Sequence, residues 1–284
     1  MGSPVPDLGG RRCFVTGAAS GIGRATALAA ARRGADLYLT DRAAEGLEET
    51  AEAVRAAGGR VSWTGTADVA DHAAVVAMAE EIHAAHGSMD VVMNVAGISI
   101  WGAIENLDHD HWRRANEIDL MGPISVLESF VPPMIAAGRG GHVVNVSSAA
   151  GLLGLPWHAP YSAAKFGLRG VSEVLRFDLR RHRIGVSLVC PGGVKTPLVG
   201  TVEIVGVDQA DPEVAKLKRR FERHAVSPEH VAEKILAGVE ANRYLVFTSR
   251  DIQLAFALQR WFPPGYRLAM RLLNDRLVAV AGPR

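Results

Sequence analysis

Tyr161 and Lys165 are the residues whose types and spacing most clearly suggest chemistry. They stand four residues apart in a stretch typical of a helix, so the phenol and the ammonium project from the same face. A phenol that exchanges a proton with an alcohol or carbonyl at neutral pH needs its pKa of about 10 lowered by roughly three units, or about 4 kcal/mol. A nearby cation supplies much of that shift. The pair predicts an acid/base site, although an ordinary helix surface can carry both side chains without function.

A glycine-rich turn near the N-terminus predicts a dinucleotide site. An apolar run from Arg12 to Thr16 is typical of a buried strand, and an Ala-rich stretch ending near Arg33 is typical of a helix. The turn between them contains Gly17, Ser20, Gly21, Ile22 and Gly23. Glycines allow close backbone approach, and the free N–H groups at the start of a helix meet a pyrophosphate. The alternative is a Gly-rich loop without a ligand.

Asp41 bears on the choice of cofactor. It follows the apolar run from Leu37 to Thr40 and lies 18 residues after Gly23, where a carboxylate accepts hydrogen bonds from the adenosine ribose. This placement favours NAD. Its neighbour Arg42 is a cation that could instead accept the 2′-phosphate of NADP or stack on adenine, and Asp41 could simply cap a helix.

The alternation of apolar runs with amphipathic stretches predicts an α/β fold. We expect a single Rossmann-type, doubly wound parallel sheet with helices on both faces, because strand–helix–strand units form right-handed crossovers. The expected strands are residues 12–16, 37–40, 60–64, 89–94, 142–147, 186–190 and 244–248, and the helices after the first are 44–57, 71–86, 108–137 and 161–181.

Several polar or small residues follow the predicted strands directly. Ligands of doubly wound sheets bind at this edge, beyond the carboxyl ends of the strands. The residues concerned are Asp68, Val69, Asn94, Ala96, Gly97, Ser148, Pro191, Gly192, Val194 and Thr196. Ser148 lies thirteen residues before Tyr161, and its hydroxyl could bond a substrate oxygen. Turn chemistry alone would also place such residues there.

These motifs, in this order, resemble the classical short-chain dehydrogenase/reductase family over roughly residues 10 to 250. The resemblance implies that Tyr161 is the acid/base, that Lys165 binds the nicotinamide ribose and lowers the tyrosine pKa, and that Ser148 orients the carbonyl. It also implies that Gly17 to Gly23 hold the cofactor, that Asn94 to Gly97 lie on its adenine side, and that Pro191 to Thr196 hold its nicotinamide end.

Asp119 departs from the family pattern. After Trp112 the family usually has Asn-Leu-x-Gly, whose Asn holds a water beside the lysine, and the same register here gives Asp119-Leu120-Met121-Gly122. Asn116 is three residues early and about 300° round a helix, so it is a poor substitute. A carboxylate near Lys165 would raise the tyrosine pKa unless it were protonated. The alternative is that Asp119 is only structural.

The substrate side is expected in three variable segments, Ile98 to Trp101, Leu152 to His158, and Leu198 to about Val207. They are rich in apolar residues and Trp, which favours a hydrophobic alcohol or ketone over a charged sugar. Trp101 and His158 are candidate substrate contacts, although His158 could be a packed or surface histidine. The basic run from Lys216 to Arg223 is interpreted as a solvated helix face after a mobile lid.

Composition bounds the remaining possibilities. A chain of 284 residues with 48% hydrophobic residues suits one large domain. The net charge of +1 gives no reason to expect nucleic acid or an anionic membrane as a partner. Cys13 and Cys190 lie in apolar runs, as buried free thiols of a reducing compartment do. We expect a cytoplasmic protein without a secretory signal, membrane span or metal site.

Beyond the last expected strand, the tail combines apolar side chains with arginines, and Pro263-Pro264 should split it into two short helices. We divide the chain into a flexible N-terminus (1–10), a dehydrogenase domain (11–250) and a C-terminal extension (251–284). The extension could pack on the domain, form a subunit contact or lie on a membrane surface, and we expect the subunit contact. Family members pair through the long helices, so a homodimer or homotetramer is expected.

We therefore expect an NAD(P)-dependent alcohol dehydrogenase or carbonyl reductase, with NAD favoured, that acts on a hydrophobic secondary alcohol or ketone. The cofactor carries the hydride, and the protein supplies the proton, the orientation and the electrostatics. A nucleotide-binding regulatory or scaffold protein with impaired turnover is the alternative. A lyase or epimerase, which leaves the cofactor's net redox state unchanged, is a third possibility.

Overall fold

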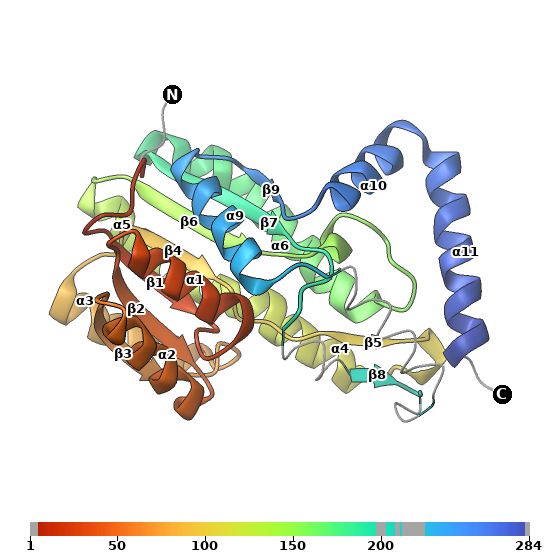
Figure 1. The fold of residues 1–284 in the computed structure, drawn as a ribbon, viewed down its shortest axis with the longest axis horizontal. Helices are drawn as coiled ribbons and strands as arrows, with labels where there is room; N and C mark the ends of the chain where they lie inside the picture. Colours follow the sequence, from red (N-terminus) through yellow and green to blue (C-terminus); the bar gives the residue numbers. More distant parts are fainter. Residues whose placement is uncertain (1–4, 197–202, 208–210, 212–224, 282–284) are drawn as a thin grey trace.

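Seven parallel strands form the central sheet of the computed structural model, which describes residues 5–196, 203–207, 211 and 225–281 (Figure 1). The order across the sheet is β3-β2-β1-β4-β6-β7-β9. In chain order the strands are β1 (Arg12–Thr16), β2 (Asp36–Asp41), β3 (Arg60–Thr66), β4 (Val91–Asn94), β6 (Gly141–Val146), β7 (Ile184–Cys190) and β9 (Leu245–Phe247). The order reverses direction next to β1, which is the topology of a doubly wound sheet and confirms the predicted fold class.

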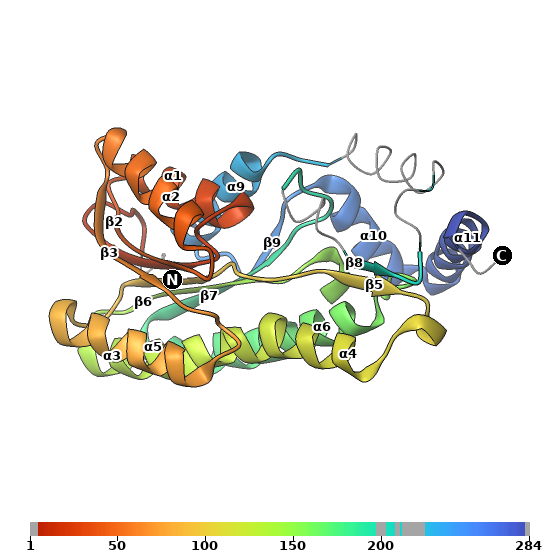
Figure 2. The ribbon, with the colours of Figure 1, turned by 90° about the horizontal axis from the view of Figure 1, so that it is seen from below.

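Helices cover both faces of the sheet (Figure 2). On one face lie α1 (Gly21–Arg32), α2 (Ala44–Ala56) and α9 (Pro228–Glu240), and on the other lie α3 (His72–His86), α4 (His109–Asn116), α5 (Gly122–Ala137) and α6 (Ala159–Asp178). The interior strands are buried along almost their whole length, which is why they show continuous apolar runs. Helix α1 lies close to the sheet because its buried positions are mostly alanines.

The long segment expected over residues 108–137 is not one regular helix. Helix α4 passes through a π-helical turn, Glu117–Met121, into α5. The wider turn directs Asp119 inward, where it is fully buried. Asn116 instead donates from its amide to the carbonyl of Trp112, 2.8 Å away. The structure therefore agrees with the register that assigned position 119, rather than 116, to the site.

The stretch His109–Ala137 is long and apolar enough to cross a membrane by length and composition, because its most apolar 18-residue window has a mean hydropathy of 1.4. Such a run was not expected from the sequence. Its helices pack against α3 and α6, and 44% of the most apolar window is buried. Helices in the core of a globular fold meet the same criterion, so this is weak evidence for a span. It is the one such helix among the described residues.

The tail forms two helices, α10 (Arg250–Trp261) and α11 (Pro263–Ala281), divided where Pro263-Pro264 predicted the break. With 19 residues, α11 is not the short helix that was expected. Figure 1 shows α11 at the end of the molecule farthest from β3. The inner side of the tail packs on an apolar cluster that includes Leu152, Leu188 and Phe256. At the other end of the chain, Val5 and Leu8 are buried in the core.

Three further elements were not expected from the sequence. A small parallel sheet pairs β5 (Ile100–Gly102) with β8 (Glu203–Val205), and α9 packs against α1. Residues 1–4, the first half of the Leu198–Val207 segment (198–202) and the basic run Lys216–Arg223 lie outside the described residues. The two cysteines are buried free thiols, as predicted.

Candidate active site

Two adjoining cavities lie at the carboxyl edge of the sheet. The tyrosine cavity, of about 460 Å³, is lined by Ser148, Tyr161 and Lys165 among others. The glycine-loop cavity, of about 440 Å³, is lined by the turn after β1 and by the ends of β2 and β3. Residues common to both cavities are Ile22, Val95, Gly97, Ile98 and Thr196. The two cavities are therefore parts of one continuous trough.

Almost all the predicted site residues line this trough. In the tyrosine cavity they are Ile22, Gly97, Trp101, Ser148, His158, Tyr161, Lys165, Pro191, Gly192, Val194 and Thr196. In the glycine-loop cavity they are Gly17, Ser20, Gly21, Ile22, Gly23, Asp41, Arg42, Asp68, Val69, Ala96, Gly97 and Thr196. Asn94 and Asp119 line neither.

Asn94 is buried inside the sheet. Its amide donates to the side-chain oxygen of Asn145, 2.9 Å away on the neighbouring strand β6. This bond joins two strands at the point where their loops diverge into the trough. The geometry gives Asn94 a structural contact, while its predicted place on the adenine side of a cofactor stays a prediction.

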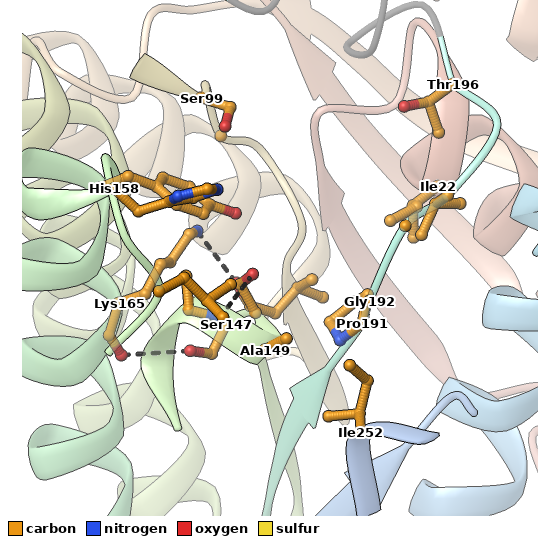
Figure 3. A pocket seen from close by; sticks show the side chains of 18 of the residues that line it. Ile22, Ser99, Ser147, Ala149, His158, Lys165, Pro191, Gly192, Thr196 and Ile252 are labelled. Atoms are coloured by element: carbon orange, nitrogen blue, oxygen red, sulfur yellow. Dashed lines mark hydrogen bonds between the residues drawn. The ribbon is translucent and has the colours of Figure 1, made fainter. Parts of the chain in front are cut away.

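The Tyr161 phenol and the Lys165 ammonium project from one face of α6, as their spacing predicted. Lys165 Nζ lies 5.6 Å from the centre of the Tyr161 ring and donates to the Val146 carbonyl at 3.1 Å. The Ser147 hydroxyl donates to the Lys165 carbonyl at 3.1 Å, which ties α6 to the end of β6 (Figure 3). Ser148 follows directly and faces the cavity, while its hydroxyl oxygen accepts from the Ala150 amide.

Asp119 forms a buried ion pair with Lys165. Its Oδ1 lies 3.2 Å from Lys165 Nζ and accepts from the Ile98 amide at 3.0 Å. No hydrogen-bond partner is found for Oδ2 within the described part of the chain. Gly97 lies against the pair, and a Cβ at that position would stand 2.6 Å from Oδ1. Only glycine fits between the trough and this pair.

The charges in this cluster oppose one another. Burial raises the pKa of the Asp119 carboxyl despite the Lys165 cation beside it. Burial works to lower the pKa of the Lys165 ammonium, but Asp119 and Tyr161 outweigh it and the pKa is raised. Lys165 is therefore a cation at neutral pH.

The Tyr161 phenol lines the tyrosine cavity, and its pKa reflects opposing influences. Burial raises its pKa above the ordinary value, Lys165 lowers it as predicted, and the Asp119 carboxylate adds to the rise. The net direction is upward, so the lowering expected from Lys165 alone is outweighed. The raised pKa keeps the phenol protonated at neutral pH, which suits proton donation to a carbonyl.

The turn after β1 has the form that a dinucleotide requires. Gly17 adopts a positive φ of 70°, and a Cβ there would meet the Ala96 backbone at 2.8 Å. Ser20 precedes the first turn of α1, and its side chain makes no capping bond to that helix. The N–H groups at the start of α1 and the Ser20 hydroxyl thus face an open cavity. These features fit NAD or NADP.

Asp41 and Arg42 lie together at the rim of the glycine-loop cavity. The Asp41 carboxylate accepts from the Ala19 amide at 3.0 Å and from the Ala43 amide at 2.9 Å, so it holds the glycine turn against the start of α2. Arg42 is exposed. The alternatives for the ribose and the 2′-phosphate both remain geometrically open.

The predicted site residues omit some that support or line the trough, among them Thr16, which directly precedes the glycine turn. The Thr16 hydroxyl accepts from the amides of Val95 and Ala96, at 3.0 and 3.1 Å, and so holds the loop after β4. Its position at the end of β1 was the available signal. Asp251 and Ile252 of α10 also line the tyrosine cavity, and no local pattern could reveal this contact between the tail and the trough.

The family model described as short chain dehydrogenase matches residues 11–204. The chain belongs to the short-chain dehydrogenase/reductase family. It is 39% identical over 226 residues to the cis-4-hydroxycyclohexanecarboxylate dehydrogenase of Sinomonas cyclohexanicum, covering 79% of this chain and 87% of that protein. The family assignment, and with it the Rossmann-type oxidoreductase, was predicted from the motifs.

Solved structures of family members agree with the observed fold. A short-chain dehydrogenase/reductase from Burkholderia phymatum in complex with NAD has a TM-score of 0.80 at 28% identity, covering 89% of this chain and 94% of that one. A metagenomic short-chain oxidoreductase in complex with NADP has a TM-score of 0.68 at 31% identity, covering 84% and 96%. NAD(P) is thus the cofactor of this fold, and the choice between NAD and NADP is not decided by the neighbours.

Among the described residues, no group of three or more His, Cys, Asp or Glu side chains is arranged to hold a metal ion. The polar groups that line the tyrosine cavity include the hydroxyls of Ser148 and Tyr161 and the Lys165 ammonium.

Proposed function

We propose that this enzyme is an alcohol dehydrogenase or carbonyl reductase that uses NAD in preference to NADP and acts on a hydrophobic secondary alcohol or ketone. The carrying observation is the continuous trough, in which Tyr161, Lys165 and Ser148 adjoin the cradle formed by the turn after β1. When bound, the nicotinamide supplies or accepts the hydride. The 39% identical relative is named as a hydroxy-acid dehydrogenase, which supports CH–OH chemistry.

Tyr161 exchanges a proton with the substrate oxygen, Ser148 holds that oxygen by a hydrogen bond, and Lys165 lowers the free energy of the phenolate. Reduction requires the protonated phenol, and oxidation requires the phenolate. Because the pKa of Tyr161 is raised, alcohol oxidation should increase with pH into the alkaline range. The pocket around these groups includes Ile98, Leu155 and Val194, which supports an apolar substrate.

Replacing Tyr161 with Phe tests this assignment. The substitution removes only the hydroxyl, so it should lower kcat/KM for ketones at least about a thousandfold while cofactor binding stays nearly unchanged. Stopped-flow turnover and a fluorescence titration of the reduced cofactor measure the two effects. Activity within tenfold of the unmodified enzyme, less than about 1.4 kcal/mol of barrier, would contradict the role.

A nucleotide-binding regulatory or scaffold protein is the second candidate. The observation that favours it is the direct Asp119–Lys165 contact, which engages the cation that the reaction needs. Cofactor binding without turnover of any alcohol or ketone in a broad panel would support this candidate.

The enzyme proposal also includes the division of the chain at residues 10 and 250. It further includes a cytoplasmic location and the absence of a nucleic-acid partner.

We further propose that the active form is a homodimer or homotetramer. Two faces carry exposed apolar side chains, one on α6 and one on the tail. Peripheral contact with a membrane through the tail is the alternative use of the second face, because arginines accompany its apolar side chains.

A further inference from the structure

His158 is a polar side chain of the tyrosine cavity to which the proposed reaction gives no task. It precedes the first turn of α6 and lies on the wall that also carries Ser99 and Lys165, opposite Ile22 and Gly192 (Figure 3). The reacting oxygen is assigned to Ser148 and Tyr161. An imidazole on the wall of an otherwise largely apolar cavity therefore needs its own explanation.

The hydrogen of the imidazole is fixed by the loop that precedes it. His158 Nδ1 lies 2.7 Å from the Pro156 carbonyl oxygen. A carbonyl oxygen only accepts, so Nδ1 carries the hydrogen and donates it. Burial lowers the pKa of His158 to about 4, although the bond to Pro156 opposes this. At neutral pH the ring is uncharged, and Nε2 presents a lone pair.

The ring is also fixed in orientation. The Trp101 indole packs on it with ring centres 4.2 Å apart, and Trp101 Nε1 donates to Ser99 Oγ at 2.6 Å. The preceding residue, Trp157, has a positive φ of 67°, and its carbonyl accepts from the Gly102 amide at 2.8 Å. A bulky residue keeps such a backbone conformation only where its surroundings impose it. The acceptor is thus held in place before any ligand arrives.

No hydrogen bond to Nε2 is found among the residues that the structure describes. His158 is partly exposed, and Nε2 is not among the enclosed atoms without a partner, so a ligand hydroxyl in the cavity can reach it and gain a hydrogen bond. Resting on the proposed function, we propose that His158 Nε2 determines specificity by accepting a hydrogen bond from a hydroxyl that the substrate carries away from its reacting carbon. The substrate class is then a hydroxylated cyclic or aromatic ketone, or the matching diol, whose ring packs beside Trp101.

The same geometry selects against other substrates. A carboxylate at this position has no hydrogen to donate at neutral pH and would meet a lone pair. An ether or an unsubstituted ring would leave Nε2 unpaired, and sites built to bond a substrate hydroxyl discriminate strongly against analogues that lack it. Asp251 is the competing acceptor, since its carboxylate also lines the cavity, but its residue is exposed on α10 and remains hydrated.

Matched ketones test the inference on the full-length protein with its cofactor. The probes are acetophenone, its 3′- and 4′-hydroxy derivatives and the corresponding methyl ethers. In the unmodified enzyme, kcat/KM for one hydroxyketone should exceed those for its ether and for acetophenone by at least about tenfold. His158→Phe should reduce this ratio to within about twofold. His158→Gln, whose amide can both donate and accept, should recover part of it.

Asp251→Asn tests the competing acceptor, and the preference for the hydroxyketone should survive this substitution. A cofactor titration of each variant verifies that its fold and cradle are intact, and the comparison of hydroxyketone with ether needs no variant. The inference is overturned if acetophenone is reduced without any hydroxyketone preference, if the preference survives in His158→Phe, or if Asp251→Asn removes it instead. If no ketone is reduced by the unmodified enzyme, the proposed function fails and the inference fails with it.

Discussion

At the scale of single residues, the centre of the site is the contact of Asp119, Lys165 and Gly97. The carboxylate stands where the family usually has an amide, and it bonds the lysine directly at 3.2 Å. In a buried ion pair, the free-energy cost of removing both charges from water opposes the attraction between them. A change in one partner therefore alters the pKa of the other. Tyr161 is affected too, because the Asp119 charge raises its pKa. The unusual residue thus acts through electrostatics on Tyr161, the proposed acid/base group.

Replacing Asp119 with Asn should lower the pH at which alcohol oxidation reaches half its maximum. Oxidation needs the phenolate, and removing a negative charge that raises the Tyr161 pKa makes the phenolate available at lower pH. Activity near neutral pH should be kept or raised. The pH profile of kcat/KM measures this, with Asp178→Asn on the exposed end of α6 as the control. An unchanged profile would remove Asp119 from the catalytic set.

Asp41 should make NAD bind more tightly than NADP. Its carboxylate faces the glycine-loop cavity and would repel a 2′-phosphate, while its two backbone contacts fix its position. Asp41→Asn removes the charge and should reduce the ratio of the NADP dissociation constant to the NAD dissociation constant about tenfold, or by about 1.4 kcal/mol. Fluorescence titration with both reduced cofactors decides the matter. Equal or tighter NADP binding by the unmodified enzyme would mean that Arg42 controls the choice.

At the scale of elements, the strands and the site at their carboxyl ends were predictable from the sequence. Buried parallel strands require continuous apolar runs, so β1, β4, β6 and β7 could be recognised in the sequence. Their carboxyl ends define the edge of the sheet where the loops converge. The spacing of Tyr161 and Lys165 then needed only an α-helix to bring them together. Local periodicity determined these features, and local periodicity is visible in a sequence.

Other elements depend on contacts that no local pattern records. Strands β5 and β8 are three residues each and exist through their pairing across about a hundred positions. The π-helical turn that buries Asp119 adds one residue to a helical ladder whose apolar pattern alone suggests a continuous helix. The hydrogen on His158 Nδ1 depends on the carbonyl of Pro156 in a loop. The upward shift of the Tyr161 pKa depends on burial, which the sequence does not measure.

The tail contacts residues 152–158, the segment proposed to face the substrate, through Tyr266, and this contact can be tested. The Tyr266 hydroxyl on α11 accepts from the Gly154 amide at 2.8 Å, in the loop that leads to His158. Tyr266→Phe should lower the free energy of local unfolding of this loop by about 1 kcal/mol, because the hydrogen bond is lost. Amide exchange over residues 152–158 should become faster and KM should rise a few-fold, while exchange over β3 stays unchanged. Unaltered exchange in the loop would show that α11 does not support the cavity.

At the scale of the molecule, two exposed apolar surfaces remain outside the core. One is a stripe on α6 formed by Ala163, Phe166, Gly170, Val174 and Phe177, which share a helix face by their spacing. The other lies on the tail, where Trp261 is 80% exposed beside Phe262. Patches of this kind mark association surfaces. The α6 stripe is the flatter candidate for self-association, because Gly170 leaves open space above the helix.

Introducing a charge on each surface distinguishes the two. Phe177 is 62% exposed and belongs to none of the apolar core clusters, so Phe177→Glu should leave the monomer folded. In an assembly formed through the α6 stripe, the new carboxylate would be buried without a partner and would prevent two stripes from packing. Light scattering should then show a dimer or tetramer for the unmodified protein and half that mass or less for the variant. Leu272→Glu, on the exposed part of α11, is the matched control and should keep the assembly. If Leu272→Glu dissociates it and Phe177→Glu does not, the tail is the subunit contact, as the sequence first suggested; if neither does, both surfaces serve another partner.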